Sequence, residues 1–269
     1  MGRIRNTIAL AKASWQVLLS DKELIWLPVF SGIAAIIMGA TFILPVALTS
    51  SDGPLGWIAA AAFYFTTSFV VIFFNTALVS AAYERLSGGD PTIKSAIGAA
   101  VSHLPAIAGW AAISATVSAI LKAIEERAGF VGSIVSSVAG LAWTLVTFLV
   151  IPVYVVEGGG VVAAIKRSGT LFKATWGENM VANVGFGIIG FVAMLPFILM
   201  AILAIVSQVG ALAVVGIVVA VVGVVAVTVV MSTLSGIFQT ALYLYASTGT
   251  VPAAFVSADL PGAFRPKHR

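Results

Sequence analysis

Five long stretches without Asp, Glu, Lys or Arg constrain the fold of this chain more than any other feature. They cover residues 24–51, 53–83, 95–121, 128–156 and 179–258. A helix needs about 20 apolar residues to cross a hydrocarbon core about 30 Å thick. The first four stretches each have room for one crossing, and the fifth has room for two with a turn at 207–210. We therefore predict six transmembrane helices, near 24–48, 56–83, 104–124, 130–156, 180–206 and 211–246.

The composition agrees with a membrane protein. Hydrophobic residues make up 60% of the chain and charged residues 9%, whereas soluble domains carry about 25% charged residues. So few charges cannot solvate a globule of this length, and lipid must cover most of the surface. We expect an all-α, polytopic membrane helix bundle that forms one membrane domain over residues 1–269.

Two features of the last stretch need a specific interpretation. The valine-rich segment 214–230 could form a strand, but it lacks the alternation of polar and apolar residues that outer-membrane strands show. Helix is therefore favoured. The sixth span is too long for a straight crossing, so we expect either a break near 232–236 or extension past the bilayer.

The basic residues indicate the orientation. Only Lys122 and Arg127 lie on one side of the predicted spans. The other twelve lie on the opposite side: Arg3, Arg5, Lys12, Lys22, Arg85, Lys94, Lys166, Arg167, Lys173, Arg265, Lys267 and Arg269. Lys and Arg accumulate in cytoplasmic loops. We therefore expect a multi-pass protein of the bacterial cytoplasmic (inner) membrane with both termini in the cytoplasm.

A short amphipathic helix is predicted before each pair of spans, lying in the membrane interface. The second begins at Asp90-Pro91, as an N-cap followed by proline at the first helical position. The expected apolar faces are Ile4, Ile8, Ala11, Trp15 and Leu18; Ile93, Ile97, Ala100 and Leu104; and Val161, Ile165, Phe172 and Trp176. Segments 74–78 (FNTAL) and 238–242 (FQTAL) also match. We predict three repeats, near 1–86, 87–157 and 158–248, with a cytoplasmic tail over 249–269.

Glu157 is the most specific candidate for an interaction site, since it is the only acidic residue between Arg127 and Glu178. It could bind a cation, a polar headgroup or a basic residue of a partner. The simpler interpretation is that it ends a span at the interface and pairs with Lys166 or Arg167. The same stretch contains the further candidates Ser168 and Trp176, and its basic residues could contact anionic lipid heads.

Asn75 and Gln239 are carboxamides near the predicted cytoplasmic ends of two spans. Interhelical hydrogen bonds explain them adequately, and a polar translocation path is the alternative. Glycines at 158–160 indicate a turn, because the flanking pattern of a phosphate loop is missing. His103 has no companion ligands, and the chain has no cysteine, so we expect no metal and no other cofactor.

Several motifs resemble an uncharacterised family of six-span bacterial inner-membrane proteins. They are Ser14-Trp15 with 21–24 (DKEL), 73–78 (FFNTAL), Trp110, Pro152 with Glu157, 164–168 (AIKRS), 176–178 (WGE), and 241–246 (ALYLYA) with Gly249, Pro252 and Phe255. Leu244 departs from the family pattern, which tends to have a basic residue there. The arrangement is more distantly similar to the membrane domains of some glycerophosphodiester phosphodiesterases, but we expect no catalytic domain here, so their activity is not carried over.

The sequence contains no catalytic motif and no charged residue near the middle of a span. We therefore expect a non-enzymatic accessory, assembly or scaffold subunit of a membrane complex. Its partners would be membrane lipids and either another protein or a second copy of the chain, with no nucleic acid. The alternative is a permease or lipid-handling protein with a path between the repeats, lined by Asn75, Gln239 and Glu157.

Overall fold

The computed structural model of the protein describes residues 3–48, 54–176, 185–207 and 209–260. Within these ranges the regular elements are helices, without strands, which confirms the all-α prediction. In chain order they are α1 (Arg3–Ser20), η1 (Lys22–Ile25), α2 (Trp26–Leu48), α3 (Pro54–Leu86), α4 (Ile93–Ser102), α5 (Leu104–Thr147), α6 (Val150–Val156), α7 (Val161–Trp176), α8 (Gly185–Val206), α9 (Gly210–Thr248) and η3 (Ala253–Phe255).

Six helical segments of the described chain are long and apolar enough to cross a membrane, as predicted. They are Lys22–Phe42, Ala61–Leu86, Leu104–Arg127, Gly132–Val156, Ile189–Val206 and Gly210–Thr248. The span Leu104–Arg127 lies within α5, and the span Gly132–Val156 begins in α5 and ends in α6. Between these two spans α5 is interrupted at Gly129, with φ 54° and ψ −132°. Glycine adopts such a positive φ at little steric cost, so the chain can reverse direction here. The protein is therefore a multi-pass membrane protein.

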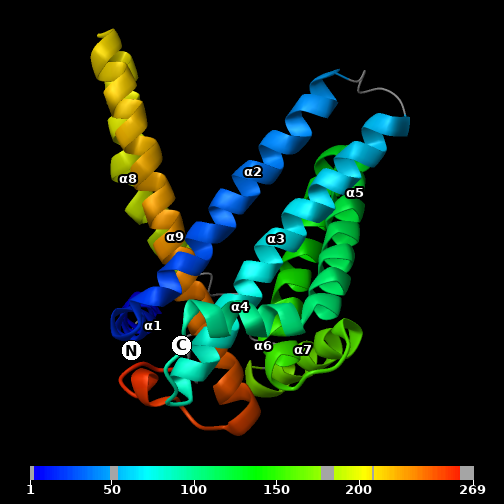
Figure 1. The fold of residues 1–269 in the computed structure, drawn as a ribbon, viewed down its shortest axis with the longest axis vertical. Coiled ribbons are helices and arrows are strands. Elements are labelled where there is room, and N and C mark those ends of the chain that lie inside the picture. The colour runs from blue at the N-terminus through cyan, green and yellow to red at the C-terminus, as the bar shows by residue number, and fades with distance from the viewer. Residues whose placement is uncertain (1–2, 49–53, 177–184, 208, 261–269) are drawn as a thin grey trace.

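The helices converge at one end of the molecule. Figure 1 shows α1, α4, α6 and α7 together at this end, which we call the base, while α2, α3, α5, α8 and α9 extend away from it. The buried hydrophobic side chains belong mainly to the base helices and to the base ends of the long ones. The largest fully buried side chains are Tyr154, Phe172, Phe255, Leu24, Leu27, Leu78, Ile107, Leu149, Ile237, Leu242, Leu260 and Val79.

The long helices form antiparallel pairs. Phe42 and Phe63 join the far ends of α2 and α3, with ring centroids 5.6 Å apart. Trp110 and Trp143 stack at 5.9 Å between the two arms of α5. The α8–α9 pair diverges from the other two above the base (Figure 1). The internal repeat remains a prediction.

Small residues allow α8 and α9 to approach closely. A Cβ on Gly216 would lie 2.2 Å from the Cβ of Ala204, and one on Gly223 would lie 2.0 Å from the ring of Phe197. Gly190 of α8 is likewise 3.3 Å from Met231 at the Cβ position. Small residues in membrane helices commonly serve such packing. These small residues therefore serve packing within the chain, between its last two spans.

The predicted break in the last span is not present. α9 is a continuous helix of 39 residues, about 58 Å long at 1.5 Å per residue. It is thus longer than a bilayer core, and its last part, from Thr233 to Tyr243, is largely buried in the base. Of the two solutions that the sequence allowed, extension past the bilayer is the one adopted.

The predicted start of the second short helix was wrong by two residues. The N-cap of α4 is Thr92, whose side chain accepts a hydrogen bond from the backbone N–H of Ser95, while Ser95 Oγ accepts from the N–H of Thr92. This reciprocal capping box fixes the helix start. Asp90 bonds Arg85 instead. Leu104, assigned to the apolar face of this helix, begins α5 and is partly exposed.

The predicted apolar face of the first helix coincides only in part with the side that packs on protein. α1 packs on the rest of the base through Leu10, Ala13, Val17 and Leu18, whereas Ile8 and Trp15 are exposed. In a helix at the membrane interface, an apolar side chain can face either protein or lipid. The periodicity of apolar residues does not distinguish the protein-facing side from the lipid-facing side. In the third short helix Phe172 is buried, Val161 and Ile165 are half-buried, and the side chain of Trp176 lies outside the described part.

Candidate interaction sites

A break between α5 and α6 explains the role of Gln239. Pro152 has no backbone N–H, so it cannot donate to the carbonyl of Phe148, its helical partner four residues earlier. The Nε2 group of Gln239, on α9, donates to this carbonyl instead. The interhelical hydrogen bond that the sequence suggested for Gln239 therefore exists. It ties the last span to the proline-containing one.

Ser168 stabilises the same break from the other side. Its Oγ donates to the carbonyl of Val146 at 2.6 Å and accepts from the backbone N–H of Leu149 at 3.1 Å. Ser168 belongs to α7 and is fully buried. A Lys-Arg-Ser sequence beside glycines could have indicated a reactive site, but this hydroxyl is engaged in joining a surface helix to a span.

Glu157 lies at the turn between α6 and α7. Arg167 Nε lies 3.1 Å from both carboxylate oxygens, and Tyr243 O–H donates to Oε1 at 3.2 Å. The Glu157 and Arg167 side chains remain 33% and 44% exposed. The turn itself is made by Gly158 and Gly159, with φ of 73° and 86°. This arrangement matches the simpler interpretation, in which Glu157 ends a span and pairs with Arg167.

A crevice lies between α2, α3 and α9, with a volume of about 530 Å³. Asn75 and Gln239 both line it, as the sequence-based alternative required. Glu157 does not contribute to its lining, so only two of the three residues expected on one path come together. The polar side chains of the lining, none of them charged, are Ser31, Asn75, Thr228, Ser232, Ser235 and Gln239.

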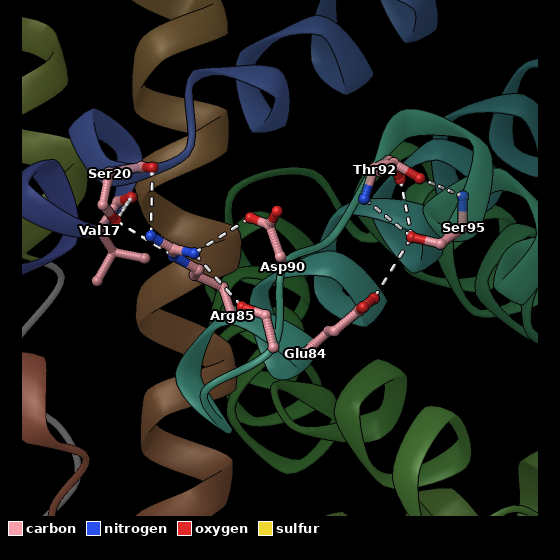
Figure 2. Close-up of polar contacts among 8 residues, drawn as sticks. Val17, Ser20, Glu84, Arg85, Asp90, Thr92 and Ser95 are labelled. Atoms are coloured by element: carbon pink, nitrogen blue, oxygen red, sulfur yellow. Dashed lines mark hydrogen bonds and ion pairs between the residues drawn. The ribbon is translucent and has the colours of Figure 1, made fainter.

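Arg85 is the centre of a cluster that joins α1, α3 and the loop before α4 (Figure 2). Its guanidinium donates to the carbonyl of Ser20 at 3.3 Å, to the carbonyl of Gly89 at 3.3 Å and to Asp90 at 3.4 Å. In the same region Glu23 Oε2 accepts from the N–H of Ile93, the first residue of α4, at 3.0 Å. The sequence marks Arg85 only as a positive charge near the end of a span.

Asp21 lies beside this cluster and is 7% exposed. Its Oδ2 has no hydrogen-bond partner among the described residues. Burial raises the pKa of this carboxyl, and the backbone of Glu23 and the charge of Arg85 oppose that effect. In the part of the chain that the structure describes, no group of three or more His, Cys, Asp or Glu could hold a metal ion.

The remaining candidate residues are either exposed or bonded to the backbone. Lys166 and Lys173 are exposed on α7, where they could meet lipid heads. His103 Nδ1 lies 2.7 Å from the carbonyl of Ala99, which agrees with the expected backbone-bonded histidine. Sequence reasoning missed Asn6, which binds both the carbonyl and the N–H of Asp259, at 3.0 and 3.1 Å. No local pattern marks a contact over such a sequence separation.

The family comparison agrees with the first resemblance noted in the sequence. Residues 55–253 of the 269 match the model of a family of unknown function, DUF6159. No curated protein matches the chain, and no solved structure matches it. The distant similarity to phosphodiesterase membrane domains therefore remains an expectation. Because the match covers more than half of its length, the chain belongs to the DUF6159 family.

Proposed function

We propose that the protein is a non-enzymatic accessory, assembly or scaffold subunit of a complex in the bacterial inner membrane, with the base in the cytoplasm. The observation that carries this proposal is the distribution of burial. The large fully buried side chains lie at the base, whereas the far parts of the spans are mostly exposed and apolar. The base provides the rigid structure, and the spans provide long surfaces for other membrane components.

The α8–α9 pair illustrates these surfaces. Its small residues face inward between the two helices, and its outer side chains include Leu203 and Val206, each 69% exposed. Helix association in membranes depends on packing and interhelical hydrogen bonds, since lipid is as apolar as the side chains. Above the base, the sides of this pair that face away from each other are mostly exposed, which supports packing against a partner's spans or a second copy.

The charged side chains at the base support a structural role. Glu157 binds Arg167, Glu23 binds the start of α4, and Arg85 binds Asp90 together with two carbonyls. Each contact joins two elements. A permease would require Asn75, Gln239 and Glu157 on one path, and Glu157 lies outside the crevice that the two amides line. The accessory role is therefore the function that we put forward.

Site-specific photo-crosslinking tests this function. A photo-crosslinking amino acid would replace one exposed apolar residue on each helix pair: Ile58 on α3, Val138 on α5 and Leu203 on α8. After illumination of whole membranes, we expect at least one position to capture a protein partner or a second copy. The uncrosslinked protein should co-purify with that partner in mild detergent at constant stoichiometry. Absence of protein crosslinks at all three positions, together with a monomer in detergent, would refute the proposal.

A further inference from the structure

The crevice between α2, α3 and α9 has a gradient of polarity along its length. On α9 its lining runs from Val225, towards the far end, to Ser235 and Gln239 near the base. On α2 it runs from Ile36, towards the far end, to Ser31 near the base. With Val71 and Asn75 of α3, the groove has its apolar residues Ile36, Val71 and Val225 towards the middle of the membrane and most of its polar side chains towards the base. Thr228 is the exception, and it donates to a carbonyl of its own helix.

The polar end has unused hydrogen-bonding groups. No hydrogen bond within the described chain involves the side chains of Ser31, Asn75, Ser232 or Ser235. Thr228 and Gln239, by contrast, each donate to a backbone carbonyl. In the hydrocarbon region no water is present to satisfy such groups, and an unsatisfied polar group is costly there. These side chains are suited to a ligand that supplies hydrogen-bonding atoms of its own.

The position of the polar end restricts the ligand to an uncharged one. Tyr243, which bonds Glu157, marks the level of the charged groups on α9. Ser232 lies eleven residues earlier on the same helix, or about 16 Å deeper at 1.5 Å per residue. The crevice has no charged lining residue to bind a phosphate at that depth. A lipid with a charged headgroup would leave that headgroup near the level of Glu157.

The size of the crevice favours a small molecule over a helix. Its volume of about 530 Å³ lies within the range of about 300–1,000 Å³ typical of small-molecule sites. Two turns of a partner helix, as a cylinder about 10 Å wide and 11 Å long, would need about 850 Å³. The lining on α9 extends from Val225 to Gln239, fourteen helical steps or about 21 Å. The groove is therefore long and narrow.

We propose that this crevice binds a neutral lipid of the diacylglycerol class, which enters sideways from the leaflet at the base. Its hydroxyl donates and accepts hydrogen bonds and its ester oxygens accept them, at Asn75, Ser232 and Ser235. One hydrocarbon chain lies along Val225 and Ile36. This site is separate from the accessory role, because the lipid binds inside the chain and a protein partner binds outside it.

Photolabelling tests the proposal. The full-length protein would be reconstituted in vesicles of phosphatidylethanolamine and phosphatidylglycerol that contain a diacylglycerol with a diazirine in one chain. After illumination, peptide mass spectrometry should place the label on the crevice sides of α2 and α9, where Ile36 and Val225 lie. Val225→Trp, which fills the groove, should remove this label. Val222→Trp should not, since Val222 is 62% exposed on the same helix and does not line the crevice.

A second pair of variants tests the polar end. Asn75→Leu should lower crevice labelling about threefold, the effect of one interhelical hydrogen bond in a membrane, and Thr66→Val on the same helix should leave it unchanged. Three results would overturn the proposal: label spread evenly over the lipid-facing helices, equal effects of the two tryptophan variants, or equal crevice labelling by a phosphatidylglycerol with the same diazirine chain. Capture of a protein by a photo-crosslinking residue at position 225 would also overturn it.

Discussion

Replacing Gln239 by leucine should destabilise the fold because it leaves the carbonyl oxygen of Phe148 without its hydrogen-bond donor. This carbonyl has Pro152 at the position of its helical donor and accepts from Gln239 Nε2 instead. Interhelical hydrogen bonds in membrane proteins contribute about 0.6 kcal/mol on average and about 1.7 kcal/mol at most. Because this bond replaces a missing backbone donor, we expect Gln239→Leu to lower the free energy of unfolding by about 1–2 kcal/mol.

A double-mutant cycle isolates the reason for that loss. Pro152→Ala restores a backbone N–H opposite the Phe148 carbonyl, so Gln239→Leu should cost less than about 0.5 kcal/mol in this background. Pro196→Ala is the matched control, since Pro196 lies inside α8 and away from the break. In the Pro196→Ala background the full loss should remain.

Reversible unfolding in mixed micelles with a rising fraction of denaturing detergent, followed by circular dichroism, measures all of these variants. The expected coupling free energy between positions 152 and 239 is about 1 kcal/mol. An equal loss for Gln239→Leu in the wild-type and Pro152→Ala backgrounds would show that Gln239 does not compensate for the proline.

Three other substitutions have definite expected outcomes in the same assay. Gly216→Ala should cost about 1–3 kcal/mol because its new methyl group would meet Ala204, while Gly39→Ala, with no neighbour within 4 Å of its Cβ position, should be neutral or stabilising. Burial raises the pKa of Asp21 above 3.8, so the free energy of unfolding of the wild type should increase as the pH falls through that raised value. Asp21→Asn should flatten this pH dependence. An unchanged dependence of the free energy of unfolding on pH would exclude Asp21 as its source. Glu157→Gln should cost less than about 1 kcal/mol, as expected of a partly exposed ion pair, and a loss of several kcal/mol would show that the carboxylate has a larger role.

The spans were predictable because their signal is local. Length and the absence of charge identify a crossing helix without knowledge of its neighbours. The turn at Gly158 and Gly159 was predictable for the same reason. The start of α4 was placed too early because Asp90-Pro91 and Thr92 both offer capping chemistry, and the choice depends on Arg85 binding Asp90 and on Glu23 reaching Ile93.

The candidate site was predictable only in part. Pro152 and Gln239 were both notable in the sequence, but their connection through the Phe148 carbonyl spans 91 residues between donor and acceptor. Ser168 belonged to a motif whose basic residues suggested a surface role, whereas its hydroxyl is buried against another helix. The crevice gathers side chains from three helices. Such contacts depend on how the helices cross, which periodicity does not specify.

The orientation of the base underlies both the proposed partner surfaces and the proposed lipid site, and labelling of single cysteines tests it most directly. The natural chain has no cysteine, so Lys94→Cys on α4 and Lys122→Cys near the turn of α5 each introduce one thiol. In intact cells, a membrane-impermeant maleimide should label the position 122 thiol and leave the position 94 thiol unlabelled until the cells are opened. Labelling of position 94 in intact cells, with position 122 protected, would contradict a cytoplasmic base.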